Sequence, residues 1–132
     1  TSSAARISSI TATAGQDAEF KELQSPDGVF KFAVSPVGHL FLYMDEEAIW
    51  GILPFSKTRQ GPHDDAKFVL QGDTGNLVVE HTTRGQIWSS EGESGAKGPF
   101  RLVVQNDGNV VLFSGNGGMH WATGTYGWGE NS

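Results

Sequence analysis

Short runs in which apolar and polar residues alternate cover most of the chain, and turn residues separate the runs. A period of two is typical of β-strands with one buried face. The pattern predicts strands at 29–34, 38–43, 48–50, 68–71, 76–79, 86–89, 102–105, 109–113 and 120–122. Residues 1–14 are rich in Ser, Thr and Ala, and they suit either an edge strand or a loose arm.

One layout, two longer runs and then a short run containing a Trp, occurs three times. Trp50, Trp88 and Trp121 lie 38 and 33 residues apart, a period at which one unit cannot bury its apolar face alone. A propeller needs at least four blades of four strands, so three units favour a compact threefold arrangement with the tryptophans inside. We therefore expect one domain over 1–132, with units at about 25–52, 64–90 and 98–123 and a tail at 124–132.

The third unit contains a tight-turn signal, Asn-Asp-Gly at 106–108. If these residues form the loop, Gln105 lies opposite Asn109, and alternation puts Gln105, Asn109, Val111 and Phe113 on one face. The opposite face is wholly apolar and must be core. With Asp107 at the loop, the first face combines two amides and a carboxylate with a hydrocarbon floor, so we expect ligand chemistry there. Because Asp107 and Asn109 lie at the end of a hairpin, we expect their loss to cost ligand contacts and not stability.

The composition narrows the function classes. A chain of 132 residues fits one domain, and 18 Gly with only 18% charged residues indicate a turn-rich β protein. The net charge of -6 argues against a nucleic-acid surface or an anionic membrane as partner. No apolar run approaches the length of a membrane span, and without Cys the sequence gives no sign of its compartment.

Catalytic and metal-binding patterns are absent from the sequence. There is no Cys nucleophile, no Gly-x-Ser-x-Gly elbow, no His-Glu-x-x-His and no phosphate loop, so an enzyme is the least favoured class. The acidic turns 45–47 and 63–65 show neither zinc spacing nor a calcium loop. The sequence therefore predicts neither a metal nor a cofactor.

The third hairpin has the form Gln-x-Asp-x-Asn-x-Val-x-Phe, and a Trp follows each hairpin. In these features the chain resembles the monocot mannose-binding, or bulb-type, lectin family over roughly residues 16–125. The resemblance implies an all-β fold, the β-prism II, with three antiparallel sheet units in a pseudo-threefold arrangement. It also implies a homodimer formed by exchange of the C-terminal strand, for which the tail would supply Tyr126 and Trp128.

The resemblance further implies that mannose binds without a metal. Asp107 and Asn109 would engage the axial 2-hydroxyl, Gln105 the 3-hydroxyl, and Val111 would pack on the ring carbons. Phe113 stands where the family has Tyr, so this position offers an apolar wall but no hydroxyl for the sugar 4-hydroxyl.

The other two units depart further from the motif. The second unit has Gln71, Asp73, Asn76, Val78 and Glu80 at the motif positions, but Thr74 and Gly75 make its loop one residue longer. Asp73 is thereby displaced, which predicts a weakened or retuned site. The first unit has lost the polar trio, which predicts an inactive site. Its residues are Ser35, Val37, His39, Phe41 and Tyr43.

The sequence supports two classes of function. The leading interpretation is a lectin for mannose or mannose-containing glycans, acting chiefly through the third unit. The alternative is a non-catalytic protein-interaction or defence module with degenerate sugar sites, because two of the three motifs are altered.

Overall fold

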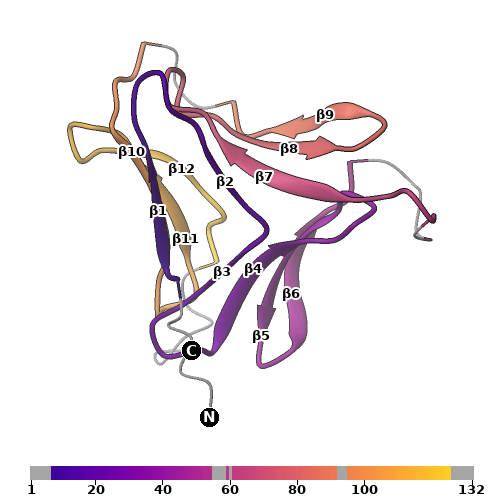
Figure 1. The fold of residues 1–132 in the computed structure, drawn as a ribbon. Helices are drawn as coiled ribbons and strands as arrows, with labels where there is room; N and C mark the ends of the chain where they lie inside the picture. The colour runs from indigo at the N-terminus through magenta and orange to yellow at the C-terminus, as the bar shows by residue number, and fades with distance from the viewer. Residues whose placement is uncertain (1–6, 55–58, 60, 92–94, 126–132) are drawn as a thin grey trace.

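The computed structural model describes residues 7–54, 59, 61–91 and 95–125, which form three four-stranded antiparallel sheets (Figure 1). One sheet has the order β1 (Ser9–Ala12), β10 (Phe100–Val104), β11 (Val110–Phe113) and β12 (Met119–Ala122). The second has β2 (Ala18–Phe20), β7 (Ala66–Leu70), β8 (Leu77–His81) and β9 (Gly85–Ser89). The third has β3 (Glu22–Gln24), β4 (Phe30–Val34), β5 (Leu40–Met44) and β6 (Glu47–Ile52).

Each repeat unit supplies three strands of one sheet, as the sequence pattern predicts. The fourth strand of each sheet comes from the N-terminal stretch, which passes all three sheets in turn (Figure 1). The choice left open for residues 1–14 is settled for Ser9–Ala12, an edge strand paired with β10. β2 and β3 were not predicted.

The three sheets share one irregularity of register. The last strand of each sheet (β6, β9 or β12) has one extra residue opposite the middle strand of its repeat unit (β5, β8 or β11). The extra residues are Ile49, Ile87 and His120. Such a bulge shifts the alternation by one. As a result, the Trp that follows each extra residue pairs with a fully buried residue of the middle strand, namely Leu42, Val79 or Leu112.

The inner faces of the three sheets meet in one core. Phe68 stacks on Phe32 with ring centroids 4.7 Å apart, which joins the second and third sheets, and on Phe20 of its own sheet at 4.9 Å. Trp121 contacts Trp50 at 6.3 Å and Trp88 at 5.7 Å, so each sheet contributes one indole. The prediction that the tryptophans pack inside is confirmed, with all three partly buried against the core.

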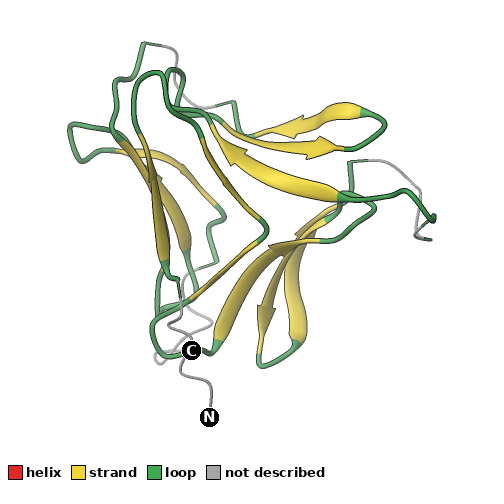
Figure 2. Cartoon of the chain, in the orientation of Figure 1, coloured by secondary structure: helices red, strands yellow, loops and turns green. Residues whose placement is uncertain are grey.

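An ion pair adds a connection at the surface. Lys21, between β2 and β3, donates from Nζ to both carboxylate oxygens of Asp65 at 2.8 and 2.7 Å. This hydrogen bond lowers the pKa of Asp65. Figure 2 shows strands joined by loops, and no helix long and apolar enough to cross a membrane occurs among the residues described.

Replacement of Trp121 by Ala is expected to destabilise the fold by about 3 kcal/mol, because the indole joins the tryptophans of all three sheets. Urea unfolding would measure the loss. Met119→Ala is the matched control, since Met119 lies in the same strand but is 68% exposed, and its effect should stay within ~0.5 kcal/mol. Equal losses for both variants would contradict the shared tryptophan cluster.

Candidate functional site

The hairpin between β10 and β11 has the three-residue loop that the sequence predicts. Gln105 N donates to Asn109 O at 2.9 Å, and Gly108 N donates to Gln105 O at 3.1 Å. Gly108 has φ +96°, and a Cβ there would lie 2.9 Å from Thr125 O and 3.0 Å from the Phe30 ring. The loop therefore needs glycine for its dihedral angle and for the close approach of neighbouring atoms.

The two faces of this hairpin have the expected characters. Leu102, Val104, Val110 and Leu112 are fully buried in the shared core. On the outer face Val103 pairs with Val111, and the hydrogen bond between Gln105 and Asn109 continues the same register. Val111 is only 5% exposed and Phe113 is half-buried. The polar groups near the loop therefore adjoin an apolar strip.

The side chain of Asn109 holds the segment after β12. Its Oδ1 accepts from Gly124 N at 3.0 Å, from Thr125 N at 3.2 Å and from Thr123 Oγ1 at 3.2 Å. Three donors at one oxygen fix the orientation of the amide, and Nδ2 has no acceptor in the described part of the chain. The expectation that loss of Asn109 would cost only ligand contacts is wrong, because Asn109 also anchors residues 123–125.

Asp107 and Gln105 complete the group of polar side chains. Asp107 Oδ1 accepts from Asn109 N at 2.9 Å, which braces the loop. Asp107 Oδ2 and the Gln105 side-chain amide have no hydrogen-bond partner among residues 7–54, 59, 61–91 and 95–125. The hairpin therefore presents three unused functions: a carboxylate oxygen, an amide that both donates and accepts, and the Asn109 Nδ2 donor.

In the second unit, the longer loop changes which residues make the hydrogen bonds that brace the hairpin loop. Asn76 N donates to Thr74 Oγ1 at 3.2 Å, so Thr74 does what Asp107 does in the third unit. Thr74 Oγ1 also donates to Gln71 Oε1 at 2.7 Å, which occupies that acceptor. The displaced Asp73 accepts from Gly15 N at 2.8 Å and so holds the turn before β2.

Toward the other end of the second motif, the surface is more polar than in the third. Val78 is 1% exposed and forms the floor, as Val111 does. Glu80, in the place of Phe113, is half-buried and pairs across the sheet with Lys67. This unit therefore offers fewer unused donors and acceptors near its loop, together with an extra carboxylate at the far end.

The first unit is aromatic where the third is polar. Ser35 Oγ accepts from His39 N at 3.2 Å, and both Val37 and His39 are buried. The rings of His39, Phe41 and Tyr43 form a row, with centroids 6.3 and 5.7 Å apart. Gly51 makes room for this row, since a Cβ there would lie 2.9 Å from the Phe41 ring.

The acidic turn at 63–65 is engaged with protein groups. Asp64 accepts from Gly61 N at 2.6 Å and lies 3.2 Å from Nε2 of the buried His81. Asp65 binds Lys21, as described above. Within the described ranges, no group of three or more His, Cys, Asp or Glu side chains is arranged to hold a metal ion.

The sequence analysis missed the roles of three residues that shape the sites. Thr123 and Thr125 hold Asn109, and Thr125 Oγ1 also donates to Gly108 O at 2.5 Å. These partners lie 14 to 17 residues further along the chain than the loop residues they contact, so no local pattern signals them. The role of Thr74 could have been predicted, because a Thr hydroxyl often accepts a hydrogen bond from the backbone N–H two residues later, here that of Asn76.

Comparisons with known proteins agree with this architecture. No model of a known protein family matches the sequence. The chain is 34% identical over 98 residues to the mannose-specific lectin of Aloe arborescens, a match that covers 74% of this chain and 82% of the relative.

Two solved structures extend the likeness to the fold. The monomeric monocot mannose-binding lectin of Gastrodia elata has a TM-score of 0.68 and 26% identity, over 90% of this chain and 98% of that one. The mannose-specific agglutinin of snowdrop, Galanthus nivalis, complexed with methyl-α-D-mannoside, has a TM-score of 0.62 and 28% identity, over 90% and 97% of the two chains. With its sequence relationship and its three sheets of the β-prism II type, the chain belongs to the monocot mannose-binding, or bulb-type, lectin family.

Proposed function

We propose that this protein is a lectin that binds mannose or a mannose-containing glycan at the third-unit site, through hydrogen bonds and without a metal ion. The observation that carries the proposal is the set of unused polar groups on Gln105, Asp107 and Asn109 beside the apolar strip of Val111 and Phe113. A sugar ring presents the complementary surface, with hydroxyls at its rim and C–H groups on its face. The mannoside complex of the snowdrop relative supports this ligand class.

The proposed pose places the axial 2-hydroxyl between Asp107 and Asn109. The carboxylate oxygen accepts from this hydroxyl, and Asn109 Nδ2 donates to it. Gln105 serves the 3-hydroxyl, and Val111 packs against the ring carbons. The 4-hydroxyl then faces Phe113, which has no group to pair with it.

The other two units contribute less to binding in this proposal. In the second site Gln71 Oε1 and Asp73 Oδ1 each already accept a protein hydrogen bond, so a sugar would meet fewer free groups. In the first site Val37 and His39 are buried, and the outer residues are Phe41 and Tyr43. We expect one strong site per chain, a weaker second site and no mannose binding at the first.

The protein acts by binding and not by catalysis in this proposal, and its relatives are lectins. A protein-interaction or defence module is the second candidate, and the aromatic row of His39, Phe41 and Tyr43 favours it. Glycan-array binding that free mannose blocks would support the lectin. Array signals that free mannose leaves unchanged would favour the second candidate.

We further propose a homodimer formed by exchange of the C-terminal segment. Residues 126–132, with Tyr126 and Trp128, lie outside the described residues. The contacts of Asn109 with Gly124 and Thr125 support the proposal in placing the residues before this segment beside the third-unit site. A single shallow sugar site is weak, and two linked sites would raise avidity on a glycan-coated surface.

Gln105→Ala is expected to weaken binding of methyl-α-mannoside about three- to tenfold, the loss of one hydrogen bond of ~0.5–1.5 kcal/mol. Its melting temperature should stay unchanged, because the Gln105 side chain has no partner among the residues described. Calorimetry in the presence of a chelator measures the affinity and tests the metal-free mechanism together. Gln71→Ala, the equivalent change in the second unit, is the control and should have a smaller effect; the reverse order would refute the site assignment.

Phe113→Tyr is expected to strengthen mannoside binding up to about tenfold, because the added hydroxyl can pair with the sugar 4-hydroxyl. Phe113 is half-buried on the outer face, so the new hydroxyl has access to solvent and ligand. The same titration with the 4-deoxy mannoside is the control, for which the two proteins should bind alike. An equal gain for the 4-deoxy sugar would mean that the pose is wrong.

Truncation after Thr125 is expected to convert a dimer into a monomer. Binding to a mannan-coated surface should fall roughly 10²-fold or more, with a far smaller change in affinity for free mannoside. Light scattering and surface binding measure the two effects. A monomeric intact chain at tens of micromolar would rule out the exchange.

A further inference from the structure

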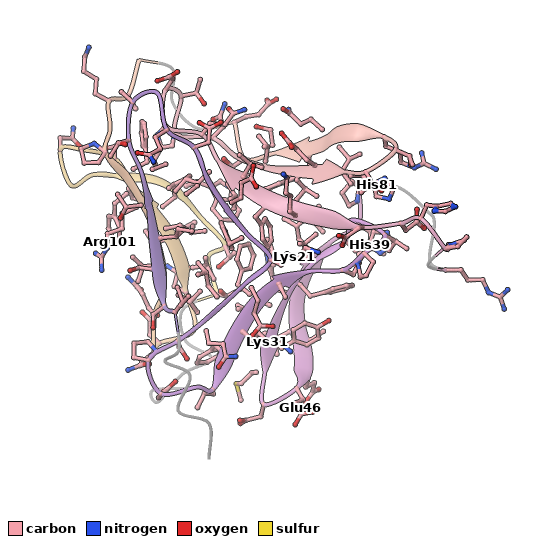
Figure 3. All side chains as sticks on the ribbon, in the orientation of Figure 1. Lys21, Lys31, His39, Glu46, His81 and Arg101 are labelled. Atoms are coloured by element: carbon pink, nitrogen blue, oxygen red, sulfur yellow. The ribbon has the colours of Figure 1, made fainter. Side chains whose placement is uncertain are left out.

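Arg101 lies on the outer face of the third-unit sheet, beside the proposed mannose site. It pairs with Phe113 across β10 and β11, and with Thr11 across β1 and β10. Directly opposed residues of neighbouring strands have Cβ atoms about 4.5–5.5 Å apart. The exposed Arg101 side chain therefore stands next to the Phe113 end of the site, on the outer side of the sheet (Figure 3).

A cation occupies the same register position in all three sheets, and only the third of these has no partner in the described part of the chain. Lys67, opposite Glu80, forms an ion pair with Glu19 at 3.1 Å. Lys31 lies over the Tyr43 ring, with Nζ 5.1 Å from its centroid. Arg101 has no ion pair, hydrogen bond or ring contact with any residue that the structure describes. Its guanidinium is available to a ligand.

The surface around Arg101 is hollowed, and its described lining contains no acidic residue. A depression of ≈ 500 Å³ is lined by Thr11, Arg101, Phe113 and Ser114, with Pro99 and glycines completing it. Lys97 lines an adjoining depression that shares Ser114 and Gly115 with the first. Among the residues that the structure describes, no carboxylate lines either one, although the chain has 15 Asp and Glu residues against nine Lys and Arg. The local field therefore favours an anion in a protein of net charge -6.

We propose that this depression is a subsite of the third-unit site for an oxyanion substituent on the glycan, a carboxylate or a phosphate monoester, with Arg101 as the group that binds it. This inference rests on the proposed mannose pose. There the 4-hydroxyl faces Phe113, and C6 is joined to C5, the ring neighbour of C4. Substituents at O4 and C6 therefore leave the site on the Arg101 side.

The residue type suits this role. A guanidinium donates two parallel N–H bonds to two oxygens of a carboxylate or phosphate, and such charge-assisted bonds are stronger than neutral ones. Phe113 cannot make a hydrogen bond to a neutral 4-hydroxyl. An anionic group further along the same side would instead bind Arg101, and this contact would replace the hydrogen bond that a Tyr at position 113 would make. The pair Phe113 and Arg101 would then select acidic mannosides over neutral ones.

Calorimetry with three sugars tests the subsite: methyl-α-mannoside, mannose 6-phosphate and methyl mannuronoside, whose C6 is a carboxylate. The wild type is expected to bind at least one acidic sugar about tenfold more tightly than the neutral one, with an advantage that shrinks as salt is raised. Arg101→Gln should reduce this affinity ratio to about one, and Arg101→Lys should keep part of it. Lys67→Gln, the change at the same register position of the second sheet, should keep the wild-type ratio.

The outcomes separate the subsite from the mannose site. Tighter binding of only the phosphate or only the carboxylate identifies the anion and supports the subsite. A wild type that binds all three sugars alike, or a preference that survives in Arg101→Gln, overturns the subsite and leaves the mannose proposal standing. Binding of acidic sugars alone would support the subsite and overturn the neutral-mannose proposal. Failure to bind any of the three would overturn both.

Discussion

The fold depends on one constraint: each repeat unit has a single apolar face that it cannot bury alone. Three strands form a sheet too small to enclose a core, so the inner faces of three sheets must cover one another. The stack of Phe20, Phe68 and Phe32, with Trp121 meeting Trp50 and Trp88, is the result. The N-terminal stretch reinforces it, because β1, β2 and β3 add one strand to each sheet.

This constraint acts on the inner positions of each strand and leaves the outer positions free to differ. The alternation of the strands keeps Leu102, Val104 and Leu112 buried whatever stands between them. The outer residues of the three hairpins have accordingly diverged into three surfaces on one frame. The outer surface is aromatic in the first unit. In the second unit its polar groups are partly engaged in hydrogen bonds with the protein. In the third unit it keeps polar groups that have no partner among the residues described.

The sequence predicted what local patterns encode. Alternation, the glycine turns and the spaced tryptophans gave the nine hairpin strands and the shared core. β2 and β3 were missed because each has only three residues, and an alternation this short does not distinguish a strand from a loop. The anchoring role of Asn109 was also missed, since its partners at 123–125 lie in contact with the hairpin only after the chain has folded.

Asn109 also shows how the site is kept in shape before a ligand arrives. Its oxygen is fixed by three donors from residues 123–125, so the amide is held in one orientation. Asp107 is held similarly, because its Oδ1 accepts from Asn109 N while Oδ2 has no partner among the residues described. A sugar would therefore meet groups whose rotamer freedom was lost during folding, which lowers the entropy cost of binding. The same arrangement makes residues 123–125 part of the site, because a movement of these residues would release the Asn109 amide.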